Sequence, residues 1–120
     1  GNMDFPTLAT FFSGLSFLFF GTGCLTSPYM KNEFIRFGYA RQRMLTGYLQ
    51  LLGGLGLLAG YWLSIPLTFF AAAGLGTMMV FGFGVRLKIR DSFLASSPAF
   101  LYAILNLYLC THYFSLLCQS

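Results

Sequence analysis

The chain has 120 residues, of which 57% are hydrophobic and only 8% are charged, and its mean hydropathy is +0.71. Soluble domains usually carry about 25% charged residues. A folded chain of this size still exposes roughly a third of its unfolded surface, so this composition would leave large apolar patches in water. The composition therefore excludes an ordinary soluble domain and indicates an integral membrane protein.

The start of the chain resembles an expression leader, because Gly1 and Asn2 precede Met3. We therefore expect residues 1–2 to be a tag remnant and residues 3–120 to form a single domain. The first apolar segment is not expected to be a signal peptide, because Asp4 precedes it and no Lys or Arg does.

Four apolar stretches follow one another along the chain, and none of them contains an acidic residue. Each approaches the ~20 residues that a helix needs to cross a hydrocarbon core. Runs such as LQLLGGLGLLAGYWL lack the period-two alternation of a membrane β-barrel. We therefore predict an all-α polytopic membrane protein, a four-transmembrane-helix bundle with spans at about 5–25, 44–63, 65–85 and 98–118.

Three of these spans open on a capping residue followed closely by proline. A side-chain oxygen at the N-cap accepts a free backbone N–H, and the fixed φ of proline suits the first helical turn. The pairs that predict helix starts are Asp4 with Pro6, Ser64 with Pro66, and Ser97 with Pro98.

All seven Lys and Arg residues lie in the connectors 26–43 and 86–97, which emerge on one side of a four-span bundle. By the positive-inside rule, that side is cytoplasmic. We therefore expect both termini to lie outside the cytoplasm. The net charge of +4 reflects this topology, and no nucleic-acid motif accompanies it.

Within the first connector, Ser27 and Pro28 predict a helix start and Gly38 predicts a stop. We expect a short interfacial helix here, with an ordered loop under the bundle as the alternative. The apolar residues that would share one face of this helix are Met30, Phe34 and Phe37.

Glycine is concentrated in the second and third predicted spans. Helix association in lipid relies on close backbone approach through small residues, so we expect these two spans to form a tight hairpin at the centre of the bundle. Gly56 and Gly60 form a GxxxG pair, which we assign to packing within the monomer rather than to a dimer seam. The expected packing residues are Gly47, Gly53, Gly54, Gly56, Gly60 and Gly76.

Polar side chains inside the spans are functional candidates by default. Gln50 in the second span and Asn106 in the fourth fall at helical spacing with tyrosines, which suggests a polar and aromatic pocket between the two spans. Alternatively, both amides only hydrogen-bond to neighbouring helices, typically worth about 0.6 kcal/mol. The candidate pocket residues are Gln50, Tyr61, Tyr102, Asn106 and Tyr113.

A second candidate site is basic and lies at the cytoplasmic surface. Guanidinium groups there can hold an anionic lipid headgroup or a phosphate. We favour the simpler interpretation, an orientation anchor, because membrane proteins need such charges for topology. The residues of this cluster are Arg43, Arg86, Lys88, Arg90 and Asp91.

The sequence argues against a catalytic centre. Its single histidine excludes a bis-histidine haem site, and its three acids are too scattered to help form a metal site. Cys24, Cys110 and Cys118 contain no C-x-x-C pair, so we interpret them as packing residues. We therefore expect no catalytic residues, no metal, and no covalently bound cofactor.

Three segments carry a resemblance to a known family. They are F-x-x-F-G-x-x-R-x-R-x-L-T-G-x-L-Q-L-L-G-G-L-G-L-L, V-R-L-K-I-R-D and S-P-A-F-L-Y-A-I-L-N. Their order resembles the DoxX-like family of small four-helix membrane proteins, from about Ser13 to Asn106. Members often carry an acid where this chain has Gln50. The matching positions are Arg43, Gly47, Gln50, Gly53, Gly54, Arg86, Arg90, Asp91, Pro98 and Asn106.

The resemblance implies an accessory or assembly subunit of a quinone-linked redox system in the bacterial inner membrane, with a partner protein beside it. The alternative is a membrane binding module for a quinone, an isoprenoid or a lipid. A self-sufficient membrane oxidoreductase fits least well, because the interior offers few groups that act as acid, base or nucleophile. Quinone or lipid is the expected ligand, nucleic acid is not an expected partner, and the sequence leaves the oligomeric state open.

Overall fold

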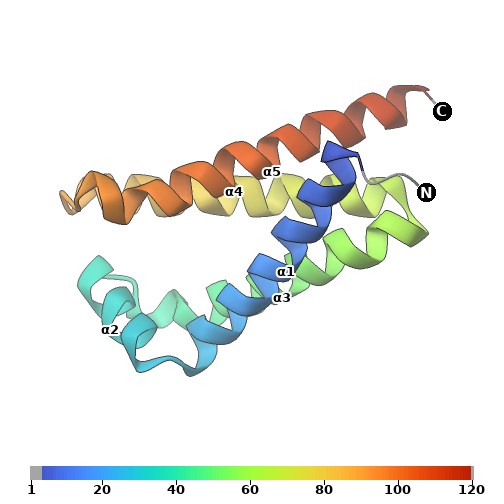
Figure 1. Cartoon of the computed structure of the whole chain (residues 1–120). Helices are drawn as coiled ribbons and strands as arrows, with labels where there is room; N and C mark the ends of the chain where they lie inside the picture. The colour runs from blue at the N-terminus through green and yellow to red at the C-terminus, as the bar shows by residue number, and fades with distance from the viewer. Residues whose placement is uncertain (1–3, 120) are drawn as a thin grey trace.

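The computed structural model describes residues 4–119, and every element in that range is a helix (Figure 1). The predicted all-α class is therefore confirmed. The predicted leader, Gly1 and Asn2, lies outside the described residues. The elements are α1 (Phe5–Thr26), α2 (Pro28–Phe37), the 3₁₀ turn η1 (Ala40–Gln42), α3 (Arg43–Leu63), α4 (Ile65–Lys88) and α5 (Phe93–Gln119).

Three of the described helices, α1, α4 and α5, are long and apolar enough to cross a membrane. The predicted count of four spans is therefore confirmed for three helices and not for α3. With 21 residues, α3 has the necessary length. Gln50 and five glycines lower its mean hydropathy. Glycines allow close approach of a neighbouring helix, and an amide can hydrogen-bond inside the protein, so neither residue type is selected for contact with lipid.

Helices α1 and α4 begin where the sequence predicts. The Asp4 carboxylate accepts the N–H of Thr7 at 3.1 Å, and the Ser64 hydroxyl oxygen accepts the N–H of Leu67 at 3.4 Å. Each helix also has its proline in the first turn. These caps satisfy donors that the helix itself leaves free.

Helix α5 begins earlier than predicted, and the pair Ser97 and Pro98 does not mark its start. The helix starts at Phe93, directly after Ser92, whose hydroxyl oxygen accepts a first-turn N–H at 3.1 Å. Pro98 therefore lies inside the helix, where it has no N–H for the Leu94 carbonyl. The Ser97 hydroxyl donates to that carbonyl instead, at 2.9 Å. The serine thus compensates for an internal proline.

The short helix predicted in the first connector is confirmed as α2, and the loop alternative is wrong. The Ser27 hydroxyl oxygen accepts the N–H of Met30 at 3.4 Å. Gly38 ends the helix with φ +84°, a left-handed conformation that glycine adopts without steric cost. Phe34 is the buried residue of this helix.

The long helices associate as two antiparallel pairs, α1 with α3 and α4 with α5 (Figure 1). This corrects the prediction that the second and third spans form the central pair, because α3 has its more extensive contact with α1. Figure 1 shows the two pairs diverging toward the end that carries α2, while both termini lie at the other end. The longest dimension is 45 Å, close to the thickness of a bilayer with its headgroups.

Glycines of α3 are divided between its two neighbours. Gly47 and Gly54 face α1, and a Cβ added at Gly54 would lie 2.7 Å from the carbonyl oxygen of Gly14. Gly53, Gly56 and Gly60 face α4. The GxxxG pair of α3 therefore packs within the monomer.

Contact between α3 and α4 is closest near their turn, where a Cβ at Gly60 would lie 2.8 Å from the backbone nitrogen of Thr68. Within the second pair, Gly76 of α4 lies against Leu107 of α5. The largest apolar side chains of the core where the pairs meet are Phe17, Leu57, Leu75 and Leu109.

Adding a methyl group at Gly60 should open the turn between α3 and α4. We expect Gly60→Ala to lower the free energy of unfolding by about 1–3 kcal/mol, because the Cβ would meet backbone atoms that have no rotamer to escape to. Thermal unfolding in mild detergent measures the loss.

The matched control is Gly74→Ala, because a Cβ at Gly74 has no atom within 4 Å. This variant should be neutral or slightly stabilising, as alanine favours a helix by up to about 1 kcal/mol over glycine. Equal stability of the two variants would contradict the close approach at Gly60.

Candidate functional site

A cavity of about 800 Å³ lies where the two helix pairs diverge, beside α2. The residues that line it come from all five α-helices and from η1. Most of them are aromatic or apolar, such as Phe20 of α1, Phe34 of α2 and Met79 of α4. This volume falls within the range of ~300–1,000 Å³ that is usual for small-molecule sites.

Two of the five predicted pocket residues, Gln50 and Tyr102, line this cavity. Tyr61, Asn106 and Tyr113 do not. Asn106 and Tyr113 are buried, while Tyr61 is 38% exposed. The predicted pocket residues therefore fall into two groups, those that line the cavity and those that make interhelical contacts, and Tyr102 belongs to both.

These interhelical contacts start from α1, which presents a hydroxyl group at every third residue. Each hydroxyl meets one of the predicted pocket residues, so the pocket tyrosines and Asn106 tie α1 to α3 and α5. The four hydrogen bonds are Thr7 to Tyr61 at 3.1 Å, Thr10 to Tyr113 at 2.7 Å, Ser13 to Asn106 at 2.8 Å, and Tyr102 to Ser16 at 2.9 Å. We call this set the hydroxyl ladder.

The α1 side of the hydroxyl ladder was not predicted from the sequence. The signal is the spacing T-x-x-T-x-x-S-x-x-S over residues 7–16, in which each hydroxyl lies about one turn from the next and is rotated partly around the helix, so the row reaches from α3 to α5. Such residues are common in membrane helices, where they hydrogen-bond across helices. The tyrosines and Asn106 could be found from the sequence, whereas their partners required the geometry.

Gln50 is the most deeply placed polar group of the cavity lining. Its side chain is buried, and the Cys24 thiol donates to its Oε1 at 3.8 Å, a long and weak contact. No second hydrogen bond of this amide is found within residues 4–119. Two further polar residues, Gln42 and Thr46, precede it at four-residue intervals and also line the cavity. Neither Gln42 nor Thr46 was predicted as a site residue.

Arg43 does not join the predicted basic cluster. Its guanidinium donates to the carbonyl oxygens of Cys24 at 2.7 Å and Leu25 at 3.2 Å. These carbonyls belong to the last turn of α1, where a positive charge is favourable. Arg43 therefore fixes the start of α3 against the end of α1. Lys88 and Arg90 are exposed and form no ion pair among the described residues.

The turn between α4 and α5 brings Asp91 back to Arg86. Arg90 has φ +59°, and the N–H of Asp91 donates to the carbonyl of Arg86 at 2.8 Å. The N–H of Arg90 donates to the carbonyl of Leu87 at 3.0 Å. This pair of hydrogen bonds is a Schellman motif, with arginine where glycine is usual. The motif places the Asp91 carboxylate against α4 and toward α2.

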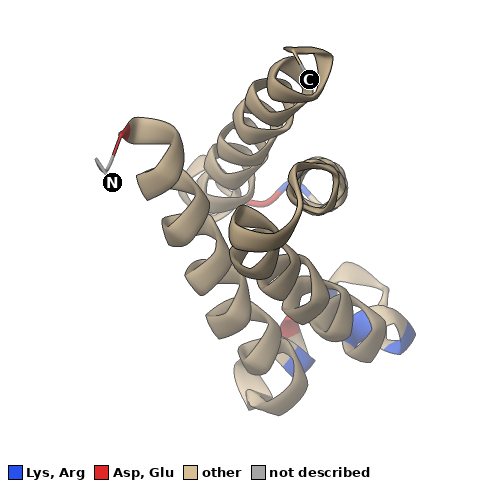
Figure 2. Ribbon diagram, turned by 90° about the vertical axis from the view of Figure 1, so that its right-hand side faces the viewer, with Lys and Arg blue, Asp and Glu red and all other residues tan. Residues whose placement is uncertain are grey.

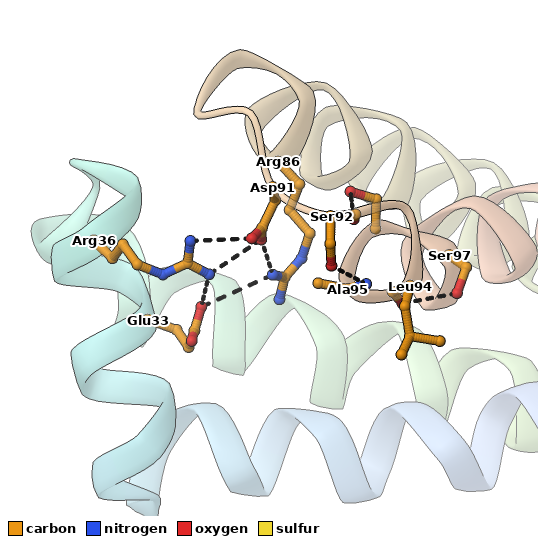
Figure 3. Close-up of polar contacts among 9 residues, drawn as sticks. Glu33, Arg36, Arg86, Asp91, Ser92, Leu94, Ala95 and Ser97 are labelled. Carbon is orange, nitrogen blue, oxygen red and sulfur yellow. Dashed lines mark hydrogen bonds and ion pairs between the residues drawn. The ribbon is translucent and has the colours of Figure 1, made fainter.

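Four charged residues connect α2 with this turn (Figure 3). Arg36 of α2 pairs with Glu33 one turn earlier and donates to both carboxylate oxygens of Asp91, at 3.1 and 3.2 Å. Arg86 lies 2.6 Å from Asp91 and 3.8 Å from Glu33. We call this set the ion cluster. It contains two acids and two bases, so its net charge is zero.

Of the five residues in the predicted basic cluster, only Arg86 and Asp91 belong to the ion cluster. Glu33 and Arg36 were missed, although their i,i+3 spacing on a helix is a recognisable signal. The hydrogen bonds from Arg36, and then those from Arg86, lower the pKa of Asp91 below its ordinary value. The Arg86 guanidinium also lies 4.9 Å from the centre of the Phe37 ring.

Acid should open the ion cluster. Because the pKa of Asp91 is lowered in the folded protein, its ion pairs stabilise fully above its ordinary pKa of 3.8 and are lost as pH falls through the lower folded value. We expect spin labels at Lys31→Cys and Lys88→Cys, in a background without native cysteines, to show a narrow distance distribution at neutral pH. It should broaden only as pH falls below 3.8, through the lowered pKa of Asp91.

Two neutralising variants separate this effect from general acid damage. Asp91→Asn should broaden the distribution already at neutral pH. Asp4→Asn removes an acid at the opposite end of α1 and should leave it narrow. A distribution that stays narrow in Asp91→Asn and in acid would show that the ion cluster does not hold α2.

Removing one hydroxyl of the ladder should also destabilise the protein. Ser13→Ala leaves the Asn106 Oδ1 without its donor. We expect the free energy of unfolding to fall by about 1 kcal/mol. This value lies between the typical energy of an interhelical hydrogen bond in lipid and the typical cost of an unpaired buried polar group. The control is Thr77→Ala, because the exposed Thr77 hydroxyl bonds only to its own helix. The stability of each variant is measured in mild detergent by titrating in a denaturing detergent. Equal stabilities of the two variants would show that the Ser13 hydroxyl contributes nothing to stability.

In Figure 2 the molecule is viewed from the end that carries the termini, and most of the Lys and Arg residues lie at the opposite end. The cavity and the ion cluster also lie at that opposite end. Within residues 4–119, no three His, Cys, Asp or Glu side chains lie close enough to share a metal ion. The site is therefore a mainly apolar cavity, with neutral polar groups from α3 and a charge-balanced ion cluster at its edge.

Comparison with known proteins agrees with the resemblance seen in the sequence. The family model described as the DoxX-like family matches residues 8–108. No curated protein and no solved structure matches the chain. The family match runs from α1 into α5 and includes the cavity, the ion cluster, and two bonds of the hydroxyl ladder, Ser13 to Asn106 and Tyr102 to Ser16. The chain therefore belongs to the DoxX-like family of membrane proteins.

Proposed function

We propose that this DoxX-like protein is a membrane binding module for an elongated apolar molecule with a polar head, the class that includes quinones, isoprenoids and lipids. The observation that carries the proposal is the cavity of about 800 Å³ between the diverging helix pairs. Helix pairs held by packing along their whole length would leave no such space. The space is lined by side chains that suit a hydrocarbon chain.

The lining favours a ligand of mixed character. Phe20, Phe34, Phe81 and Met79 offer aromatic and polarizable apolar surface. Gln50 offers an amide with spare hydrogen-bonding capacity about 10 Å along α3 from its start. A few polar groups in a mainly apolar cavity are typical of sites that orient a small molecule.

The membrane topology is part of the proposal. We assign α3 as a fourth span, because it has 21 residues and is joined to α4 by a turn at Ser64. Its lower hydropathy follows from Gln50 and from glycines that pack against α1 and α4. The basic end of the bundle then faces the cytoplasm of a bacterium and both termini lie outside, in the inner membrane.

The accessory role in a quinone-linked redox system, which the family resemblance implies, stays a prediction. It is compatible with the binding module, since a subunit that holds a quinone beside a partner protein would perform both roles. A stoichiometric partner that remains bound through mild-detergent purification would support this role. Repeated isolation of the chain alone would count against it.

Filling the cavity should abolish binding. Gly82 lines the cavity, and a Cβ added there meets no atom within 4 Å, so Gly82→Leu can place its side chain in the space without a backbone clash. We expect affinity for a benzoquinone with a decyl side chain to fall at least about tenfold, equivalent to about 1.4 kcal/mol. Equilibrium binding to protein in lipid nanodiscs measures it.

The matched control is Gly74→Leu, the same substitution two turns earlier on the same helix. A Cβ at Gly74 also has open space, but Gly74 is exposed and does not line the cavity. It should bind the quinone as the unsubstituted protein does. Equal binding by both variants would overturn the proposal.

A further inference from the structure

We infer that the head of the bound molecule is uncharged, so that the cavity accepts hydroxyl or carbonyl heads and rejects phosphate heads. This inference rests on the proposed function and specifies its ligand. Three features of the site carry it, namely the balance of charge at its edge, a stripe of neutral polar residues on α3, and the apolar surface of α2 and α4.

The charge at the edge of the cavity is balanced. Arg86 is the one charged side chain among the cavity residues within 4–119. Its guanidinium lies 2.6 Å from the Asp91 carboxylate and 3.8 Å from that of Glu33. Both carboxylates are largely covered, with side chains 14% and 13% exposed. A phosphate at this edge would meet a cation that two acids already neutralise.

An anion deep in the cavity would meet no cationic side chain of the lining other than Arg86, because Arg43 does not line the cavity and donates to two backbone carbonyls in the last turn of α1. Burying an unpaired charge is far more costly than burying a hydrogen-bonded neutral group, and one base whose charge is already compensated does not offset that cost. Lys88 and Arg90 are exposed and do not line the cavity. They can hold anionic headgroups at the membrane surface, outside the site.

Neutral polar residues of the lining form a stripe that runs from the exposed Gln42 at the edge of the cavity to the buried Gln50. Gln42, Thr46 and Gln50 follow at intervals of four residues, which places them on one face from η1 into α3. The stripe is about 12 Å long. Gln42 and Thr46 make no side-chain hydrogen bond within residues 4–119, and Gln50 makes only the weak contact from Cys24. Amides and hydroxyls both donate and accept, so they match hydroxyl and carbonyl groups.

The remaining lining accommodates the apolar part of such a molecule. Phe34 and Met30 come from α2, and Met79 and Phe81 come from α4. Figure 3 shows how the ion cluster connects α2 to the turn after α4 at this edge. The site therefore combines a stripe of neutral polar residues with apolar walls, and the charged residues at its edge form ion pairs with one another.

A matched pair of lipids tests the inference. Dioleoylglycerol and dioleoyl phosphatidic acid share their acyl chains and differ by one phosphate. Native mass spectrometry of the protein released from mild detergent, titrated with each lipid, gives the two affinities. Binding that persists in Gly82→Leu is subtracted, because it lies outside the cavity. We expect the uncharged lipid to bind at least about tenfold more tightly within the cavity.

Glu33→Gln should then change the selectivity. It leaves the bridge from Arg36 through Asp91 to Arg86 in place but gives the ion cluster a net positive charge. The preference for the uncharged lipid should shrink several-fold, through tighter binding of phosphatidic acid. Asp4→Asn changes the net charge of the protein equally, at the far end of α1, and should leave the preference unchanged.

The possible outcomes separate the two proposals. Cavity binding of phosphatidic acid as tight as that of dioleoylglycerol would overturn the inference and leave the binding module standing. The same holds if Glu33→Gln and Asp4→Asn alter selectivity equally. Binding of neither lipid nor the quinone above the level of Gly82→Leu would overturn the proposed function, and the inference with it.

Discussion

The hydroxyl ladder of α1 is the interaction on which the rest of the structure depends. Lipid tails are as apolar as the helix surfaces they meet, so burial of apolar area alone does little to hold transmembrane helices together. Hydroxyls from Thr7 to Ser16 therefore connect α1 to α5 through three hydrogen bonds, and add one to α3, against which α1 already packs closely at glycines. All lie before Phe17 in α1, toward the end of the bundle that carries the termini. Beyond Ser16 the two helix pairs are free to diverge, and the cavity forms there.

The ion cluster complements the ladder at the opposite end. It holds the α2 helix to the turn between α4 and α5 by charge, at a level where Arg36 remains partly exposed to water. Ion pairs of this kind are weak when fully exposed and stronger when several charges share partners, as Asp91 does with two arginines. The cavity is thus bounded by the hydroxyl ladder in the interior of the bundle and by the ion cluster at the surface of the bundle.

The composition of α3 is explained by the same arrangement. Its glycines allow close approach to α1 on one side and to α4 on the other, and its stripe of Gln42, Thr46 and Gln50 faces the cavity. Both requirements lower its hydropathy relative to the other long helices. Glycines that lie against a neighbouring helix and polar side chains that face a cavity are tolerated in such a helix, because those positions do not meet lipid.

The sequence by itself determined the class of protein, the helix boundaries at Asp4 and Ser64, the short helix after Ser27 and the family. These depend on composition and on contacts between residues a few positions apart, which local rules describe. Gln50 and Tyr102 could also be selected as candidate pocket residues, because polar groups are rare within apolar stretches, and both line the cavity. The pairing of α1 with α3 and the start of α5 were decided by the tertiary structure. The tertiary structure also decided which predicted pocket residues line the cavity and which belong to the hydroxyl ladder. It likewise decided that Arg86 and Asp91 form the ion cluster with Glu33 and Arg36. The physical reason is that these features depend on which helix faces meet, and several glycine-rich and hydroxyl-bearing faces of this chain could have met equally well by sequence alone.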